Sequence, residues 1–144
     1  MQLIRLVQPA GTGSMQSYSS SYGQLTLHMC FVVKYRQKAF VNGRVAKVCE
    51  LAMRQTAQLY GVEIKEIGFD QDHVHLLVSV NPTVSPAKIA HMLKGASAHT
   101  LFRAFPWLKI KLWGGHFWSP AYFFDSVGTQ TYERIEAYVQ KQGI

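Results

Sequence analysis

The sequence contains no long apolar run and only two cysteines. No apolar stretch in the 144 residues approaches the roughly 20 residues that a membrane-spanning helix needs, so we expect no membrane association. Cys30 and Cys49 each lie within an apolar pattern, and they form no CxxC pair. We therefore expect both to be reduced core residues, as is usual in a cytoplasmic protein, although a single disulfide between them would also be compatible with the count.

Acidic residues are also scarce. Eight Asp and Glu face fifteen Lys and Arg, which gives a formal net charge of +7 and an isoelectric point near 9.6. A surplus of this sign favours a polyanionic partner such as nucleic acid, because Lys and Arg release counterions when they contact phosphates. A basic protein without such a partner would have the same composition, so charge alone leaves both interpretations open.

The length and composition indicate one folded domain with a short leader. A hydrophobic fraction of 48% in 144 residues suffices for a single packed core. Residues 1–20 are rich in Gly, Ser and Gln, and their only apolar run, Leu3–Val7, is too short for a secretion signal. We expect residues 1–20 to be a flexible leader or residues left from cloning, and residues 21–144 to form the domain.

Hydrophobic periodicity predicts four strands and three helices. Alternating or short apolar runs indicate strands, and apolar residues at helical spacing indicate helices. In chain order the predicted elements are a strand at 24–35, a helix at 43–60, strands at 62–69 and 73–80, a helix at 85–104, a strand within 117–127 and a helix at 129–142. The connector 106–115 is aromatic and basic. This β-α-β-β-α-β-α order predicts an α+β fold, with an antiparallel sheet of four to five strands and helices packed on one face, as in ferredoxin-like domains.

Two histidines share one face of the strand at 73–80. His73 and His75 are two residues apart, so their side chains project to the same side, while Val74 and the alternate apolar residues after it line the other side. The apolar side should lie under the helices, which directs the histidines away from the core, towards solvent or a partner. Two such imidazoles can share a divalent cation, although histidines in this spacing more often form only hydrogen bonds, and two ligands do not complete a site.

The last predicted helix offers a nucleophile and a further ligand. Tyr138 and Gln142 are four residues apart and share a helix face. A phenol can attack a phosphate when a cation polarises the phosphoryl oxygen, and an amide oxygen can bind a hard metal ion. Tyr132 and Glu136 have the same spacing, and a helical tyrosine more often serves packing, so the pattern alone does not choose between these alternatives.

Several motifs along residues 22–142 resemble the single-tyrosine HUH transposases of small bacterial insertion sequences, where U is a bulky apolar residue. The most specific is Asp72-His73-Val74-His75-Leu76-Leu77, which resembles the HUH signature. The others are Leu27-His28 with Val33-Lys34-Tyr35-Arg36, Leu93-Lys94-Gly95-Ala96-Ser97-Ala98, Lys111-Leu112-Trp113-Gly114-Gly115 with Phe117-Trp118-Ser119-Pro120-Ala121-Tyr122, and the YxxxQ motif Tyr138-Val139-Gln140-Lys141-Gln142.

The resemblance implies an RRM-like HUH nuclease fold and a transposase activity. It implies that Tyr138 is the nucleophile, and that His73, His75 and Gln142 bind Mg²⁺ or Mn²⁺. The expected substrate is single-stranded DNA with hairpin ends, cleaved and rejoined through a 5′-phosphotyrosine intermediate with a free 3′-hydroxyl. It further implies a homodimer with composite active sites, in the cytoplasm and at the nucleoid of a bacterium or archaeon. The long first strand, residues 24–35, is our candidate for the dimer edge.

Basic and aromatic residues provide candidates for DNA contacts. The phosphate-binding candidates are Lys34, Arg36, Lys88, Lys94 and Arg103, and the base-stacking candidates are Tyr35, Trp113 and Trp118. For the aromatic residues, packing in the core is the stronger expectation.

Two other functions remain open. A domesticated relative would bind hairpin DNA without transposing it, but it would have no need of the complete set His73, His75, Tyr138 and Gln142. A replication- or relaxase-type HUH endonuclease more often has a third histidine near the pair, or two tyrosines on one helix. The remaining candidates for such a third histidine are His91, His99 and His116.

Overall fold

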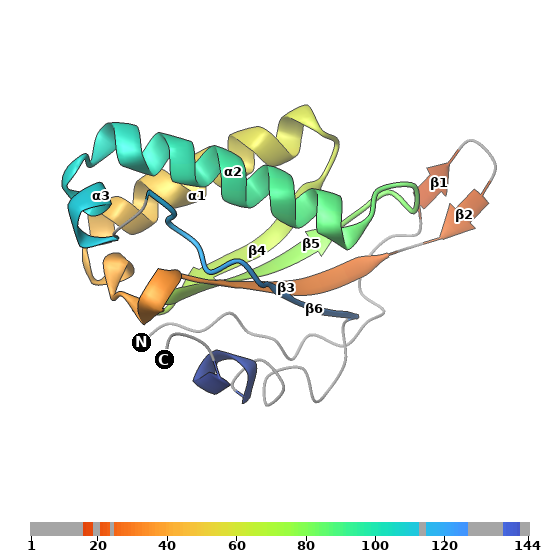
Figure 1. Ribbon diagram of the computed structural model, residues 1–144. Coiled ribbons are helices and arrows are strands. Elements are labelled where there is room, and N and C mark those ends of the chain that lie inside the picture. Colours follow the sequence, from red (N-terminus) through yellow and green to blue (C-terminus); the bar gives the residue numbers. More distant parts are fainter. Residues whose placement is uncertain (1–15, 19–20, 24, 113–114, 127–136, 142–144) are drawn as a thin grey trace.

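The computed structural model describes residues 16–18, 21–23, 25–112, 115–126 and 137–141. Its centre is a four-stranded sheet in the order β4-β5-β3-β6, in which every neighbouring pair is antiparallel (Figure 1). The strands are β3 (Thr26–Val32), β4 (Glu63–Phe69), β5 (His73–Ser79) and β6 (Phe123–Ser126). The predicted α+β class and antiparallel sheet are confirmed, and the adjacent strands β4 and β5 form a hairpin.

A second, two-stranded sheet precedes the four-stranded sheet in the chain. Strands β1 (Gln16–Tyr18) and β2 (Ser21–Gly23) pair antiparallel with each other and are not part of the larger sheet. Sequence analysis assigned residues 16–18 to the leader, because a run of Ser, Tyr and Gln has no hydrophobic alternation that would indicate a strand. Residues 1–15 and 19–20 of that leader lie outside the described part of the chain.

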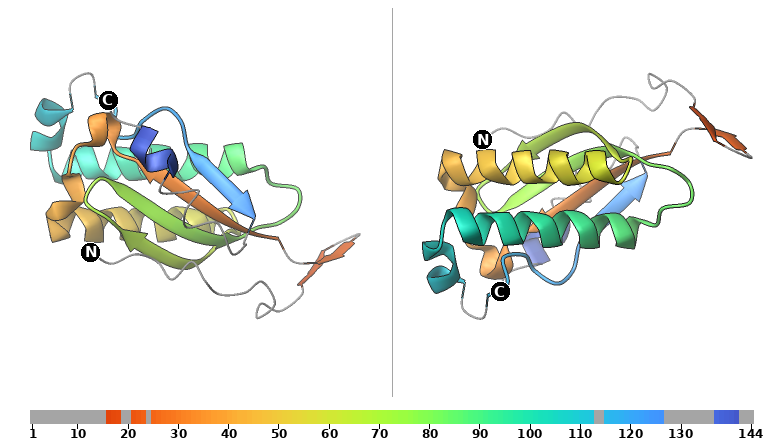
Figure 2. Two further views of the ribbon diagram at one scale, coloured as in Figure 1. Left: turned by 90° about the horizontal axis from the view of Figure 1, so that it is seen from below. Right: turned by 90° about the horizontal axis from the view of Figure 1, so that it is seen from above.

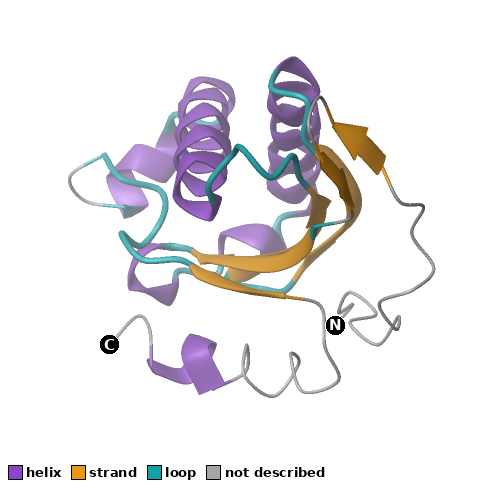
Figure 3. Ribbon diagram, turned by 90° about the vertical axis from the view of Figure 1, so that its right-hand side faces the viewer, coloured by secondary structure: helices purple, strands orange, loops and turns teal. Residues whose placement is uncertain are grey.

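Two long helices cover one face of the sheet. Helices α1 (Gly43–Leu59) and α2 (Pro86–Ala104) lie side by side over this face (Figures 2 and 3). The side chain of Asn42 accepts a hydrogen bond from the Arg44 amide at the start of α1, and the side chain of Ser85 accepts one from the Lys88 amide at the start of α2. A short helix, α3 (Trp107–Lys111), occupies the segment predicted as a connector.

The core lies between these helices and the sheet. Residues at alternate positions of β3 and β5, among them Met29, Phe31, Val74 and Leu76, are fully buried against apolar residues of α1 and α2. Burial of each such side chain contributes on the order of 2 kcal/mol, so the alternation in sequence determines which face of each strand carries the helices. Cys49 lies in this core, and both cysteines are buried thiols outside any disulfide.

The opposite face of the sheet is also covered. Residues 137–141 are helical and lie across this face, as Figures 1 and 3 show. Val139 is buried there with Cys30 and Val32, and the side chains of Phe123 and Tyr138 pack against them. The prediction of helices on one face therefore describes α1 and α2, whereas the C-terminal helix lies on the other. Residues 129–136 of its predicted span are not described.

The position of β3 overturns the predicted dimer edge. β3 pairs with β5 along one side and with β6 along the other, so it lies inside the sheet. Its length and apolar character come from being central, since a strand that is buried on both faces needs apolar residues at nearly every position. Among the described strands, β4 and β6 are the edges of this sheet.

A buried hydrogen bond ties α2 to the segment before β6, and it gives a test of the packing. Trp118 Nε1 donates to Ser97 Oγ at 3.0 Å, and Ser97 Oγ donates to the Leu93 carbonyl at 2.6 Å. We expect Ser97→Ala to lower the free energy of unfolding by about 1–3 kcal/mol, because the indole N–H would stay buried without an acceptor. Urea denaturation measures this. In the Trp118→Phe background the same substitution should cost much less, and an equal cost in both backgrounds would contradict the assignment.

The described helices do not include one that is long and apolar enough to cross a membrane.

Candidate active site

Strand β5 presents His73 and His75 on the face opposite α1 and α2. They pair in register with Val32 and Cys30 of β3, and the cluster formed by Cys30, Val32 and Val139 lies on this same face. The two histidines lie on the predicted face, away from α1 and α2, but they do not reach solvent, which was one of the two surroundings, solvent or a partner, that the sequence left open. His73 is 3% exposed and His75 is 1% exposed. Sequence alternation identified the face, but it does not reveal that the C-terminal residues cover it.

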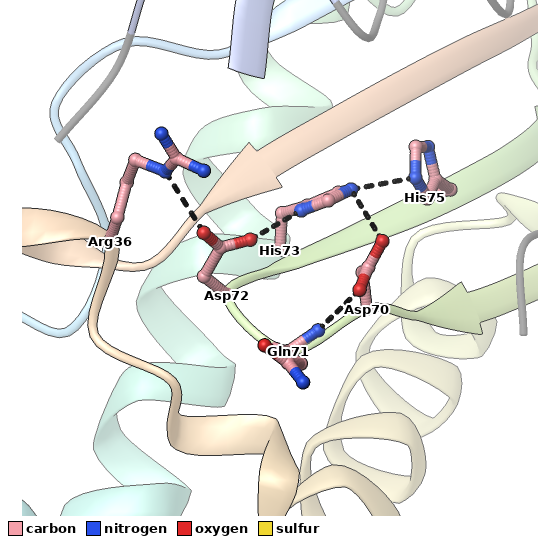
Figure 4. Close-up of polar contacts among 6 residues, drawn as sticks. All are labelled: Arg36, Asp70, Gln71, Asp72, His73 and His75. Atoms are coloured by element: carbon pink, nitrogen blue, oxygen red, sulfur yellow. Dashed lines mark hydrogen bonds and ion pairs between the residues drawn. The ribbon is translucent and has the colours of Figure 1, made fainter. Parts of the chain in front are cut away.

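The two imidazoles face each other through their Nε2 atoms. The His73 Nε2–His75 Nε2 distance is 2.9 Å, and the rings are inclined at 77° (Figure 4). Two nitrogen ligands about 2.1 Å from one cation and 90° apart would be about 3.0 Å apart. The separation of the two Nε2 atoms therefore suits neighbouring positions around a single six-coordinate ion.

A carboxylate and an arginine fix the orientation of His73. Asp72 Oδ1 accepts a hydrogen bond of 2.7 Å from His73 Nδ1, and Asp72 Oδ2 accepts one of 3.0 Å from Arg36 Nε (Figure 4). Burial alone would raise the pKa of Asp72, but the bonds from His73 and Arg36 outweigh it and lower the pKa. Because the proton stays on Nδ1, the lone pair of His73 Nε2 is available to a metal, as in carboxylate–histidine–metal arrangements.

His75 is held in its neutral form. Burial, followed by the nearby His73 and His28, lowers its pKa to about 3. Its Nδ1 is buried and has no hydrogen-bond partner among the described residues. A neutral imidazole whose Nε2 meets that of a second histidine is a good ligand for a divalent ion. The donor set of His73 and His75 thus fits a metal site.

Asp70 is a further acidic group close to this pair, and sequence analysis missed it. Its Oδ2 lies 3.7 Å from His73 Nε2, while its Oδ1 accepts a hydrogen bond from the Gln71 amide at 2.8 Å. Its position three residues before His73, in the link between the two strands, is the sequence feature that could have indicated it. Within the described ranges, no three His, Cys, Asp or Glu side chains are close enough together to hold a metal ion. The predicted third ligand, Gln142, lies outside the described residues.

His28 is a second residue that sequence analysis did not assign to the site. It is buried on the same face of the sheet, in β3 opposite Leu77, and burial lowers its pKa although Asp125 opposes the shift. Its alternation with Leu27 and Met29 already placed it on the polar side of the strand. His28 is not close enough to form a three-ligand cluster with His73 and His75 in the described structure.

Tyr138 lies on the same face as the histidines. Its ring packs at 5.7 Å from that of Phe123 and belongs to the cluster with Cys30, the residue that pairs with His75 in the sheet. The hydroxyl is buried without a hydrogen-bond partner among the described residues, and burial raises its pKa to about 12. Tyr138 is therefore a neutral phenol in this arrangement. The rival residues Tyr132 and Glu136 lie outside the described residues.

The proposed DNA contacts occupy different environments. Lys34, Tyr35 and Arg36 form the 3₁₀ turn η1 (Lys34–Arg36) directly after β3, whereas Lys88 and Arg103 are exposed on α2. Lys94 donates to three carbonyl oxygens at residues 119–121, so its ammonium is already bound within the protein. Trp118 is buried, in line with the expectation of core packing, and Trp113 lies outside the described residues.

The three histidines left open as extra ligands do not approach the pair. His91 and His99 are exposed on α2, on the other side of the sheet from His73 and His75. His116 is exposed in the segment between α3 and β6. None of these three histidines is therefore the third histidine that a relaxase-type site more often has near the pair.

Asp72 provides a direct test of the metal site. We expect Asp72→Asn to weaken Mn²⁺ binding about 10- to 100-fold, because an amide no longer fixes the His73 tautomer or balances Arg36. Isothermal titration calorimetry measures the affinity. Glu50→Gln is the matched control, since Glu50 accepts a comparable bond of 2.9 Å from Arg54 at an exposed place on α1. Equal affinities in the wild type and in Asp72→Asn would contradict the role given to Asp72.

The lowered pKa of His75 predicts acid sensitivity in the protein without metal. The unfolded chain takes up a proton at His75 near its ordinary value of 6.5, but in the folded protein the pKa is about 3. The contribution of neutral His75 to the free energy of unfolding is therefore fully present above pH 6.5. It is lost as the pH falls towards 3, by up to about 5 kcal/mol. We expect the melting temperature in EDTA to fall below pH 6.5, and less steeply in His75→Gln. A melting temperature that stays constant from pH 7.5 to pH 5 would contradict this expectation.

Comparison with known proteins identifies relatives over nearly the whole domain. Residues 21–142 match the family model described as "Transposase IS200 like". The chain is 40% identical to the ISDra2 transposase TnpA of Deinococcus radiodurans, over 83% of this chain and 84% of that protein. It is 30% identical to the transposase for insertion sequence element IS200 of Salmonella typhimurium, over 90% of this chain and 84% of that protein.

Solved structures show the same fold. A crystal structure described as a transposase from Deinococcus radiodurans has a TM-score of 0.84 and 33% sequence identity, and the match covers 89% of this chain and 98% of that one. A REP-associated tyrosine transposase bound to a REP hairpin has a TM-score of 0.54 at 13% identity, over 87% of this chain and 70% of that one. At this low identity the second likeness concerns the fold.

Proposed function

The chain belongs to the IS200-like transposase family, and from this premise we propose that it cleaves and rejoins single-stranded DNA at the ends of an insertion sequence. Because its relatives are transposases, the chain is a DNA-processing enzyme. The observation that carries the finer proposal is the pair of Nε2 atoms of His73 and His75, 2.9 Å apart on the face of the sheet where Tyr138 packs. A metal-binding pair next to a tyrosine suits phosphoryl transfer.

We assign His73, His75 and Gln142 to the binding of Mg²⁺ or Mn²⁺. When bound there, the ion would supply Lewis acidity to the scissile phosphate. The chain itself contributes the orientation of its ligands: Arg36 holds Asp72, and Asp72 holds the Nδ1 proton of His73. Both histidines are buried, and removal from water strengthens charge interactions at the site.

Tyr138 is the proposed nucleophile. Its Oη forms a bond to phosphorus as the bond from phosphorus to the 3′ oxygen breaks, and the phenol proton leaves while the departing 3′ oxygen gains one. The product is a 5′-phosphotyrosine and a free 3′-hydroxyl. Because the number of phosphoester bonds is conserved, attack by another 3′-hydroxyl reverses the step and joins new ends without an external energy source. The buried phenol must leave its contact with Phe123 to reach the phosphate.

We also propose a homodimer with composite active sites, as the family resemblance implies. The available edges of the described four-stranded sheet are β4 and β6, because β3 is paired on both sides. We place the contact with the second subunit at one of these two edges.

Incubation with single-stranded DNA tests the proposal. An oligonucleotide that carries an imperfect hairpin end should give a covalent adduct that survives SDS when Mg²⁺ or Mn²⁺ is present. We expect no adduct with the fully double-stranded form or in EDTA. Reversible binding of the hairpin without any adduct, under the same metal conditions, would instead favour the domesticated hairpin-binding relative.

A further inference from the structure

A pocket lies directly beside the proposed active site. It has a volume of about 490 Å³ and lies between the chain segment that follows β3 and helix α3. Tyr35, Arg36 and Lys38 line it from the first side, and Trp107 and Lys111 line it from the second. Arg36 belongs both to the lining and to the Arg36–Asp72–His73 chain of hydrogen bonds, so the pocket adjoins the histidine pair through one shared residue.

Two exposed aromatic side chains flank the opening. Tyr35 is 51% exposed and Trp107 is 41% exposed, although tyrosine and tryptophan usually bury most of their surface. Each ring has an ammonium group over it: Lys34 Nζ lies 5.3 Å from the centre of the Tyr35 ring, and Lys111 Nζ lies 5.9 Å from that of Trp107. Aromatic faces next to cations are the elements that bind unpaired nucleotides, because bases stack on the rings and phosphates pair with the cations.

The charge and size of the pocket agree with this chemistry. Its charged lining residues are Arg36, Lys38 and Lys111, and the described lining contains no acidic side chain. Side-chain amides of Gln37 and Asn42 add groups that can hydrogen-bond the edge of a base. The volume lies within the range of about 300–1,000 Å³ that is usual for small-molecule sites, which is enough for one nucleotide.

The backbone at the pocket is held in an unusual conformation. Tyr35 and Arg36 have φ angles of 59° and 50°, the left-handed region that side chains other than glycine seldom occupy. Hydrogen bonds from the Lys34 amide to the Phe117 carbonyl and from the Arg36 amide to the Val33 carbonyl fix this turn, at 2.9 and 2.8 Å. The turn directs Arg36 to Asp72 while the Tyr35 ring stays exposed at the pocket. Strain that is maintained in this way is characteristic of functional sites.

We propose that this pocket binds one unpaired nucleotide of the DNA substrate, with its base stacked on Tyr35 and Trp107 and its phosphate at Lys38 and Lys111. The inference rests on the proposed function, and it adds a binding subsite that lies outside the histidine pair. Since Arg36 links the pocket to Asp72, a nucleotide bound here would set the register of the strand at the neighbouring active site.

Binding and cross-linking test the subsite. In a Tyr138→Phe background, which prevents cleavage, fluorescence anisotropy measures the affinity for a single-stranded hairpin-end oligonucleotide. We expect Tyr35→Ala and Trp107→Ala to weaken binding roughly five- to fiftyfold, as loss of a stacked base does, and Trp107→Phe to stay within about threefold of the parent. Lys111→Gln should weaken binding and reduce its dependence on salt concentration.

Two matched controls isolate the pocket. Tyr60 is 54% exposed and does not line the pocket, so Tyr60→Ala should bind DNA like the parent. Lys109 lies on α3 two residues before Lys111, with its ammonium over Phe102, and Lys109→Gln should likewise leave binding unchanged. Equal losses in the Tyr60 and Tyr35 variants would overturn the subsite.

Photo-cross-linking identifies the position of the base. A 5-iodouracil placed in turn at each unpaired position of the oligonucleotide should cross-link to Tyr35 or Trp107 at one position, as located by mass spectrometry. Cross-links only elsewhere, with unchanged affinity in both alanine variants, would overturn the subsite while leaving the cleavage proposal intact. The opposite outcome is that the alanine variants lose binding while the protein with Tyr138 intact forms no covalent adduct with the same DNA. That pair of results would support the subsite and refute the proposed cleavage.

Discussion

Replacement of Tyr138 by phenylalanine is expected to abolish the covalent protein–DNA adduct, with a loss on the order of 10³-fold or more. The substitution removes only the attacking oxygen and keeps the ring that packs against Phe123. Because the hydroxyl is buried without a partner among the described residues, its removal should leave the free energy of unfolding unchanged or raise it. Labelled DNA on denaturing gels measures the adduct, and urea denaturation measures the stability.

Two other tyrosines serve as controls. The ring of Tyr122 packs against that of Phe124, and the Lys94 ammonium lies over it. Tyr122→Phe should retain adduct formation. Tyr132 has the same helical spacing to Glu136 that Tyr138 has to Gln142, so it is the rival nucleophile. An adduct that persists in Tyr138→Phe and disappears in Tyr132→Phe would show that the nucleophile is Tyr132.

His75→Ala is expected to have an effect of similar size, because it removes one of the two nitrogen donors that face each other at 2.9 Å. We expect Mn²⁺ binding to fall below detection in calorimetry and adduct formation to decrease on the order of 10³-fold. His91→Ala is the control, since His91 is exposed on the other side of the sheet. Activity of His75→Ala near the wild-type level, with Mg²⁺ still required, would exclude His75 as a ligand.

The same variant also tests the composite site. His75→Ala keeps a functional Tyr138, and Tyr138→Phe keeps a functional histidine pair. If each active site takes its tyrosine and its histidines from different subunits, a mixture of the two inactive proteins should recover part of the activity through mixed dimers. If each subunit forms its own site, the mixture should remain inactive.

Local sequence patterns predicted the elements well. The starts of α1 and α2 and the alternation in β3 and β5 each depend on a few neighbouring residues, and each was found close to where the sequence placed it. The order of the strands depends on pairing between distant segments, and it was not predictable in the same way. β6 lies almost a hundred residues after β3 in the chain, yet it pairs with β3 and makes it a central strand.

The same difference between local patterns and distant contacts explains why only part of the site was predicted. The spacing of His73 and His75 determines that they share a strand face, which needs only the periodicity of a strand. Their burial is not evident from the strand pattern, and neither is the packing of Val139 against Cys30 and Val32 on the same face, because no local pattern reports contacts between distant segments. The Arg36–Asp72 bond joins residues 36 positions apart through a turn of left-handed backbone, for which neither Tyr35 nor Arg36 gives a sequence signal.

The surroundings of the Tyr138 hydroxyl have a consequence for which DNA strands can be attacked. A phenol whose pKa is raised to about 12 is almost entirely protonated at neutral pH, and the partly buried side chain of Tyr138 packs against apolar residues. Under the proposed mechanism, a bound strand must draw the phenol away from Phe123 before attack. We therefore propose that the substrate is selected before any bond is broken, and that the protein without a bound substrate is inert towards other single strands.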